Sequence, residues 1–199
     1  MRIRTLMKHT LIITLIIMLM LTVPTLAASK KKKALKAYRK YMSKSMITVK
    51  DNGVKTRVNP EQFAVIKLNG DKVPELVTLS NSRLYFFCYK KGKIRQIGDT
   101  GQFTSGAYYY PGKQLLKNSF FAGVGVSSEV YIQVNVKKGK MTSLGTAIFG
   151  MNFRDYYIQS RQVSYSSYSS YIRKLTGSVR EKEIRFIQNT KKNRRQYLK

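Results

Sequence analysis

The sequence predicts an α+β fold, with an N-terminal helix, a central antiparallel β-meander of two hairpin repeats, and C-terminal helical segments. Three observations support this prediction. Apolar residues recur at helical spacing near both ends of the chain. The region between them, about 63–150, holds short β-branched and aromatic runs separated by Gly, Asn, Ser and Pro. One strand–turn–strand pattern occurs there twice, and antiparallel hairpins need no crossover helices.

The first 27 residues have the pattern of a secretory signal peptide. Three cations precede an apolar run over residues 11–21, which Pro24 ends. A small residue at Ala27 suits signal peptidase, so we expect cleavage there, with Ala28 as the alternative site. The run is shorter than the roughly 20 residues of a spanning helix, which favours cleavage over a retained anchor. The mature chain is then one domain, residues 28–199.

An N-terminal helix is predicted over residues 30–42. Leu35, Tyr38 and Met42 recur at helical spacing, so one face should dock while lysines cover the other. The triplet at 51–53, Asp-Asn-Gly, predicts a tight turn, because Asn and Gly tolerate positive φ.

Strands are predicted in the central region at residues 63–68, 75–79, 84–89, 94–97, 130–134 and 141–144. The segment 84–98 aligns with the segment 130–145, with one residue inserted before a shared Lys-Lys-Gly-Lys. Each copy predicts a strand, a glycine turn and a returning strand. Between the copies, residues 106–112 and 121–126 contain several glycines and are interpreted as loops or strand ends.

The C-terminal part, about 164–199, is predicted to be helical. Ser164 is the expected N-cap of a helix that Gly177 ends. One face of this helix would carry Tyr168, Tyr171, Ile172 and Leu175. The final basic segment, residues 189–199, is interpreted as a further short helix.

The charge is strongly unbalanced, with 38 Lys and Arg against nine Asp and Glu. Removing the signal peptide leaves 35 cations and nine acids, an excess of +26. Such a surface attracts polyanions: an anionic cell-wall polymer, an anionic membrane surface or, without specificity, nucleic acid. The candidate polyanion-binding residues lie at both ends of the mature chain: Lys30, Lys31, Lys32, Lys33, Lys191, Lys192, Arg194 and Arg195.

The residue types of common catalytic sites are scarce. The single histidine, His9, leaves with the signal peptide, and the carboxylates stand in no recognisable acid/base motif. Cys88 lies in an apolar aromatic run and is interpreted as a buried thiol. One cysteine cannot form an internal disulfide, and we expect no disulfide-linked partner. The sequence therefore predicts a protein that is not an enzyme, and it assigns no catalytic residue.

The segment 68–76, Leu-Asn-Gly-Asp-Lys-Val-Pro-Glu-Leu, has the spacing of a calcium loop, with Asn69, Asp71 and Glu75 as candidate metal ligands. It resembles the Asp-x-Asn-Gly-Asp-Gly-x-Pro-Glu-Leu loop of integrin-like (FG-GAP or VCBS-type) β repeats. Lys67 and Lys72 replace the leading aspartate and the glycine of that pattern. An ammonium repels a divalent cation, which favours a structural turn over bound calcium and predicts no cofactor.

The resemblance extends to the Lys-Lys-Gly-Lys hairpins, the run at 156–158 and the segment 189–198. Together these are similar to uncharacterised small secreted proteins of Gram-positive bacteria. The resemblance implies a fold and an extracellular location, either free or retained at the cell wall, and it implies no catalytic residue. The expected function is non-catalytic binding of anionic cell-envelope components. Alternatives are a protein-interaction module using a tyrosine-rich face and, with less support, a calcium-binding module or a hydrolase.

Overall fold

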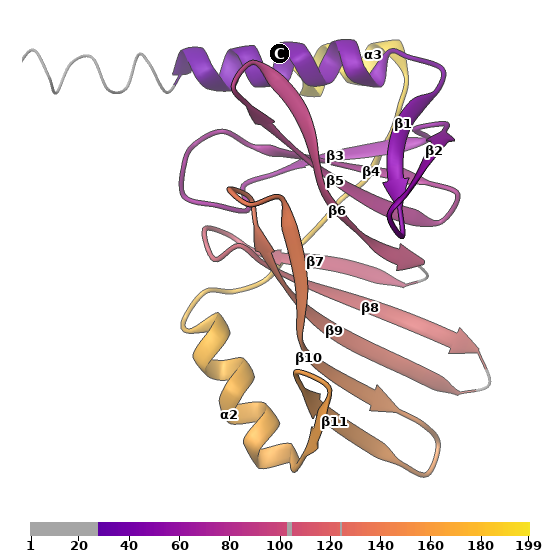
Figure 1. Ribbon diagram of the computed structural model, residues 1–199, viewed down its shortest axis with the longest axis vertical. Coiled ribbons are helices and arrows are strands. Elements are labelled where there is room, and N and C mark those ends of the chain that lie inside the picture. Colours follow the sequence, from indigo (N-terminus) through magenta and orange to yellow (C-terminus); the bar gives the residue numbers. More distant parts are fainter. Residues whose placement is uncertain (1–27, 103–104, 124) are drawn as a thin grey trace, which may run out of the picture.

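The computed structural model describes residues 28–102, 105–123 and 125–199, and it is rich in β-structure (Figure 1). Among these described residues, strands hold 50% and helices 20%, in three sheets and three helices. The α+β prediction is therefore wrong. Its main error lies between the two hairpin repeats, where segments interpreted as loops or strand ends contribute to the strands β7, β8 and β9. The predicted signal peptide, 1–27, lies outside the described residues.

Two large antiparallel sheets form most of the fold. The five-stranded sheet is ordered β14 (Ile187–Gln188), β3 (Gln62–Ile66), β4 (Glu75–Ser80), β5 (Arg83–Lys90) and β6 (Lys93–Gln102). The seven-stranded sheet is ordered β12 (Arg161–Val163), β11 (Arg154–Ile158), β10 (Lys140–Phe149), β9 (Val126–Asn135), β8 (Leu115–Gly123), β7 (Gly106–Tyr110) and β13 (Lys182–Glu183).

The two hairpin repeats belong to different sheets. The first copy forms β5 and β6, and the second forms β9 and β10. Their turns use positive φ at Lys91 and Gly92 in the first and at Gly139 in the second, a conformation that glycine adopts without steric cost. The copies therefore do not continue one meander, because β7 and β8 lie between them and start the second sheet.

The main core lies between the two large sheets. Buried side chains such as Val77 and Phe86 come from the five-stranded sheet and pack with Leu116 and Ile132 of the other. Cys88 belongs to this core, which confirms the predicted buried thiol, and burial raises the pKa of that thiol. Apolar burial on this scale is the main stabilising contribution in a fold without a disulfide.

A separate two-stranded sheet, β1 (Ile47–Asp51) and β2 (Val54–Val58), flanks the five-stranded one. Its turn has positive φ at Asn52 and Gly53, which confirms the turn predicted at 51–53. The Gln96 amide of β6 holds the main chain of Lys50, accepting from its N–H at 2.6 Å and donating to its carbonyl at 2.7 Å. Arg83 adds an ion pair to Asp51 at 2.7 Å.

The helices cover different sheets. The N-terminal helix, helical over residues 28–42, buries the predicted face of Leu35, Tyr38 and Met42 over the five-stranded sheet. The last helix, α3 (Lys191–Tyr197), lies beside it in Figure 1. At the other end of the molecule, α2 (Tyr165–Thr176) packs on the seven-stranded sheet. The two helices of the C-terminal part therefore pack on different sheets.

Local signals at α2 agree with the prediction. The Ser164 hydroxyl accepts from the Ser167 N–H at 3.3 Å, and Gly177 ends the helix at a φ of 59°. Between α2 and α3 the chain adds β13 and β14 to the edges of the two large sheets, so residues 164–199 are not helical throughout. Within the described part of the chain, no helix combines the length and apolar character needed to cross a bilayer.

Candidate polyanion-binding groove

The two ends of the described chain are joined through Asn189, which precedes α3. Its side-chain amide donates to the Met42 carbonyl at 3.0 Å and to the Pro60 carbonyl at 2.7 Å. The guanidinium of Arg194 then donates to the Asn189 carbonyl at 2.8 Å and to its side-chain oxygen at 2.9 Å. Leu198, fully buried after α3, packs in the core beneath the N-terminal helix. These contacts hold α3 alongside the end of that helix.

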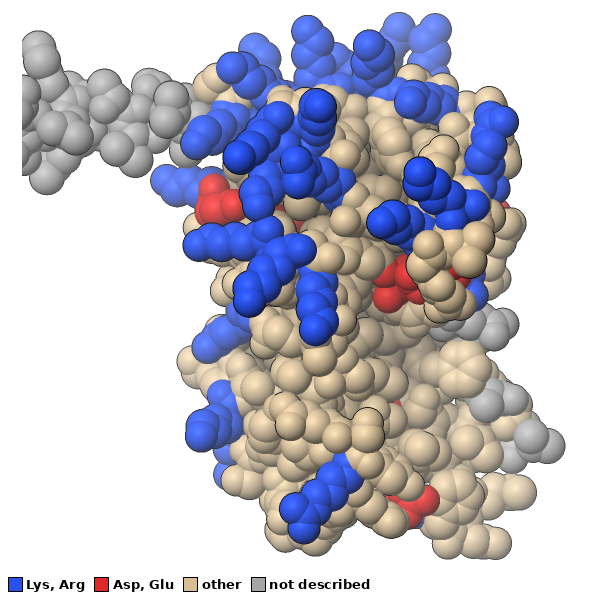
Figure 2. Space-filling view, viewed as in Figure 1, with Lys and Arg blue, Asp and Glu red and all other residues tan. Residues whose placement is uncertain are grey.

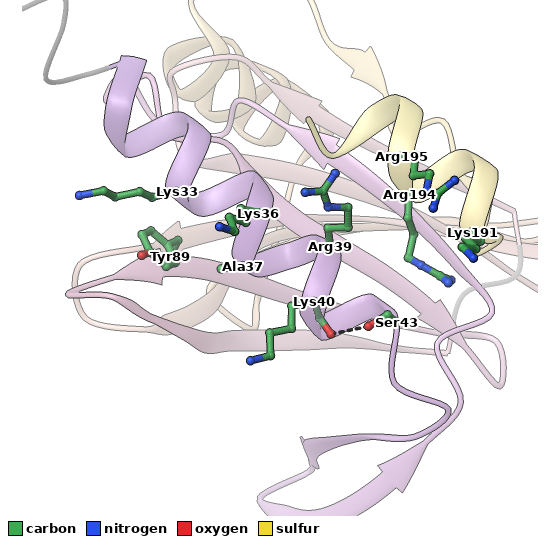
Figure 3. Close-up of a pocket in the computed structure, with 10 residues that line it drawn as sticks. All are labelled: Lys33, Lys36, Ala37, Arg39, Lys40, Ser43, Tyr89, Lys191, Arg194 and Arg195. Carbon is green, nitrogen blue, oxygen red and sulfur yellow. Dashed lines mark hydrogen bonds between the residues drawn. The ribbon is translucent and has the colours of Figure 1, made fainter.

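A groove of about 610 Å³ lies on the outer surface of these two helices. Figure 3 shows the ten residues that line it: Lys33, Lys36, Ala37, Arg39, Lys40, Ser43, Tyr89, Lys191, Arg194 and Arg195. Seven of the ten are cations, four from the N-terminal helix and three from α3. The methylene stems of Lys and Arg, together with Ala37 and the Tyr89 ring, provide apolar wall beneath the charges.

No carboxylate lines this groove. Across residues 28–102, 105–123 and 125–199, the ion pairs use other cations: Arg83, Lys117 and Arg185. Figure 2 shows Lys and Arg side chains crowded over the end of the molecule where the two helices lie. Like charges held this close repel one another, so the groove carries an unbalanced positive potential.

The structure brings together only half of the polyanion-binding residues predicted from the sequence. Lys33, Lys191, Arg194 and Arg195 line the groove, whereas Lys30, Lys32 and Lys192 do not. Lys31 lines a second hollow of about 500 Å³, where its companions are Lys67 and Lys72. This second hollow is also without a carboxylate among its lining residues.

Sequence reasoning missed Lys36, Arg39 and Lys40. The signal for them was present, because positions 33, 36 and 40 share one face of a helix whose opposite face is apolar. The sequence predicts lysines on that face, but the candidate polyanion-binding residues come only from runs of nearly consecutive cations.

The predicted calcium ligands have internal partners. Asp71 accepts from the Val73 N–H at 3.0 Å and from the Asn69 side-chain amide at 3.1 Å. The Asn69 side-chain oxygen accepts from the Asp71 N–H at 3.0 Å. Glu75 is 2% exposed and accepts from the Leu68 N–H at 3.0 Å. Burial raises the pKa of Glu75 to about 8, so the neutral acid predominates at pH 7.

These contacts do not fit a calcium site. Calcium needs six to eight oxygens turned toward one point. Here the oxygens accept from neighbouring main-chain and side-chain amides, and Lys72 holds the bend at a φ of 62°. Among the residues that the structure describes, no three of His, Cys, Asp or Glu are grouped as metal ligands. The loop is arranged as a self-contained turn.

The tyrosine-rich strand β7 is engaged inside the fold. The Tyr110 hydroxyl donates to Glu181 at 2.9 Å, and Lys117 donates to the same carboxylate at 2.8 Å. The Lys117 ammonium also lies 4.6 Å from the centre of the Tyr108 ring. Tyr109 packs toward the core between the large sheets. This arrangement gives little support to a partner-binding tyrosine face.

No family model matches this chain, and no curated protein or solved structure matches it either. The similarity to integrin-like repeats therefore stays a prediction, and the groove is interpreted from its own geometry.

Proposed function

We propose that this is a secreted, non-catalytic protein that binds an anionic polymer of the cell envelope in the groove between the N-terminal helix and α3. The observation that carries the proposal is the convergence of seven cations, without a lining carboxylate, from two ends of the chain. Export is the prediction drawn from residues 1–27, and retention at the cell wall would follow from the binding.

The chemistry of the groove suits phosphate. Arg offers a planar fork of donors and Lys a compact charge, and both pair strongly with phosphate oxygens. Binding would neutralise charges that repel one another in the free protein, so the polymer gains affinity from relieving that repulsion. It would also release counterions, which makes the affinity fall steeply with salt.

A polymer suits the shape better than a small anion. The groove is open and runs across two helices, and the second basic hollow, at Lys31, Lys67 and Lys72, also includes Ala28 at the start of the N-terminal helix. Neither site presents an enclosed pocket that would distinguish one small molecule. Many weak contacts to successive phosphates of the polymer would supply the affinity. They would give little selectivity for the chemical groups that link one phosphate to the next.

The distribution of acids also supports binding over catalysis. Each carboxylate of the mature chain has an internal partner: five form ion pairs and four accept hydrogen bonds from amides. In order along the chain they are Asp51, Glu61, Asp71, Glu75, Asp99, Glu129, Asp155, Glu181 and Glu183. The cations that line the groove form none of these ion pairs, which leaves their charge for an anionic ligand.

Retention on purified cell walls tests the proposal. The groove variant Lys36→Gln/Arg39→Gln/Lys40→Gln should bind about tenfold more weakly than the wild type at low salt, because three phosphate contacts are lost. A matched variant, Lys137→Gln/Lys138→Gln/Lys140→Gln, removes the same charge from the exposed β9–β10 turn and should bind almost normally.

Walls stripped of their phosphate polymer by acid are the second control, and they should retain little protein. Equal loss in both triple variants would mean that net charge alone drives retention, and the groove would then have no special role. Undiminished retention on stripped walls would exclude the polymer as ligand.

A further inference from the structure

The second basic hollow, of about 500 Å³, is built on the loop that joins β3 to β4. This loop has the spacing of a calcium loop, but its lysines give it the opposite charge. Lys67 and Lys72, which replace the aspartate and the glycine of that pattern, both line the hollow. Lys31 of the N-terminal helix is the third cation there.

Main-chain hydrogen bonds fix the loop against the β7–β8 turn, which also lines the hollow. The Gly112 N–H donates to the Lys67 carbonyl at 3.4 Å, and the Gln114 N–H donates to the Leu68 carbonyl at 2.8 Å. The Leu68 side chain is fully buried. The main chain that carries Lys67 is therefore held in place by the fold.

The acids of the loop belong to a different hollow. Asp71 and Glu75 line a neighbouring space of about 410 Å³ and do not line the basic one. The Asp71 carboxylate accepts from the Val73 N–H, and Glu75 accepts from the Leu68 N–H. Burial raises the pKa of Glu75 to about 8, so this acid adds little negative charge at pH 7.

The three lysines of the hollow have no acidic partner. In the part of the chain that the structure describes, none of them takes part in an ion pair, and all three are exposed. Lys72 holds a φ of 62°, a conformation that glycine adopts without steric cost and lysine does not. Three like charges around one hollow repel one another, and a bound anion would relieve that repulsion.

We propose that this hollow binds a phosphate group through the ammonium groups of Lys31, Lys67 and Lys72. Lysine binds phosphate as a compact charge, and its hydrogen bonds to phosphate oxygens are strengthened by that charge. A loop with the spacing of a cation site would thus hold an anion.

The phosphate would belong to the polymer of the proposed function, and this part of the inference rests on that proposal. Three adjoining hollows lead from the groove to the loop. The middle one shares Tyr89 with the groove, and it shares Asn69 and Gly70 with the basic hollow. Lys90 and Lys137 line the middle hollow as well. One polymer chain that follows this course would contact both basic sites and gain affinity from their combination.

Titration of inorganic phosphate into isotope-labelled protein, followed by NMR, tests the loop directly. We expect saturable shifts of the amide signals of Gly70, Lys72 and Gly112, and no such shifts in a separate titration with calcium chloride. Lys67→Gln/Lys72→Gln should weaken phosphate binding about fivefold or more, the effect of losing one close charge contact in water. Lys31→Gln should weaken it as well, although this residue belongs to a different element.

The matched control is Lys91→Gln/Lys93→Gln. It removes the same charge from the exposed β5–β6 turn, and Lys91 has a φ of 50°, similar to that of Lys72. Phosphate binding at Gly70 should be nearly unchanged in this variant. Circular dichroism checks that both double variants fold.

Chain length distinguishes a free phosphate from a phosphate of the polymer. Tripolyphosphate is too short to contact both basic sites, whereas long-chain polyphosphate can reach them together. We expect Lys67→Gln/Lys72→Gln to lower the affinity for the long chain about fivefold. The groove variant Lys36→Gln/Arg39→Gln/Lys40→Gln should still show the phosphate-induced shift at Gly70, so failure of the groove does not imply failure of the loop site.

Unchanged phosphate binding in Lys67→Gln/Lys72→Gln would overturn the proposal, as would an equal loss in the Lys91→Gln/Lys93→Gln control. Saturable shifts of the loop amides with calcium would also overturn it. Phosphate binding at the loop with undiminished affinity of the loop variant for long-chain polyphosphate would contradict the shared polymer and leave free phosphate as the ligand.

Discussion

The side-chain amide of Asn189 donates a 3.0 Å hydrogen bond to the main-chain carbonyl of Met42, which lies 147 residues earlier in the sequence. Met42 is the last helical residue of the N-terminal helix, and Asn189 stands directly before the N-cap of α3. This one side chain therefore ties together the two helices whose cations line the groove. The groove exists because of long-range packing and not because of a local motif.

Asn189→Ala should loosen that connection. The substitution leaves the Met42 and Pro60 carbonyls without this donor and removes one of the two acceptors of Arg194, so we expect a loss of about 1–3 kcal/mol in the free energy of unfolding. Urea denaturation measures it. Asn193→Ala is the matched control, because its amide bonds only the nearby Gln188 carbonyl at an exposed position. An equal effect of the two changes would argue against the anchoring role.

Glu75 should make stability depend on pH. Its pKa is raised by burial to about 8 in the folded protein and lies near 4.5 when the chain unfolds. The folded state therefore holds the proton more tightly, and the free energy of unfolding should fall as pH rises from about 4.5 to 8. Each unit of pKa difference contributes about 1.4 kcal/mol at most.

Glu75→Gln separates this effect from other titrations. The amide oxygen can still accept from the Leu68 N–H, but the side chain no longer titrates. The variant should lose much of the decline in stability between these pH values, as followed by thermal unfolding. A decline of unchanged slope would mean that another group is responsible.

Calcium should leave the protein unchanged. Asn69 and Asp71 already bond to neighbouring amides, and Glu75 is buried and mostly neutral at pH 7. Millimolar calcium should therefore shift Tm no more than the same concentration of magnesium does, since an ion that binds only the folded state would raise it. A saturable increase specific to calcium would restore the metal-loop hypothesis.

Added salt should stabilise the wild type. Screening weakens repulsion among the groove cations and across a chain with 38 Lys and Arg against nine Asp and Glu. Raising NaCl from about 0.05 to 0.5 M should increase Tm, because the Debye length falls well below the spacing of surface charges. The groove variant Lys36→Gln/Arg39→Gln/Lys40→Gln should gain less from the same change. Identical gains in both proteins would show that the groove is not a centre of repulsion.

Much of the secondary structure follows from local signals. Helical spacing at Leu35, Tyr38 and Met42 was sufficient for the N-terminal helix, and the caps at Ser164 and Gly177 were sufficient for α2. In both cases the information lies within a few residues. The same holds for the two glycine-turn hairpins, whose strands pair with their immediate neighbours along the chain.

The arrangement of the strands was harder to predict. Glycine and proline around Tyr108 and Phe121 indicate loops or strand ends. These residues do lie at the ends and turns of β7 and β8, but the residues between them pair as strands. The short strands β13 and β14 have two residues each and carry no periodic signal. Which sheet a hairpin joins depends on distant partners, so the sequence pattern could not show that the repeats lie in opposing sheets.

The candidate groove was predictable only in part. The cations at both ends of the chain were evident, but their proximity depends on the contacts of Asn189 and Leu198 with the region of the N-terminal helix.

Hydrogen exchange with and without a soluble phosphate polymer from the cell wall tests the central claim most directly. Binding in the groove should slow exchange at the amides of residues 28–42 and of α3, and leave the β9–β10 turn unchanged despite its exposed lysines. The protection should disappear in the groove variant and at high salt. Protection spread evenly over all lysine-rich turns, or none at either helix at a saturating polymer concentration, would contradict the assignment of this groove as the binding site.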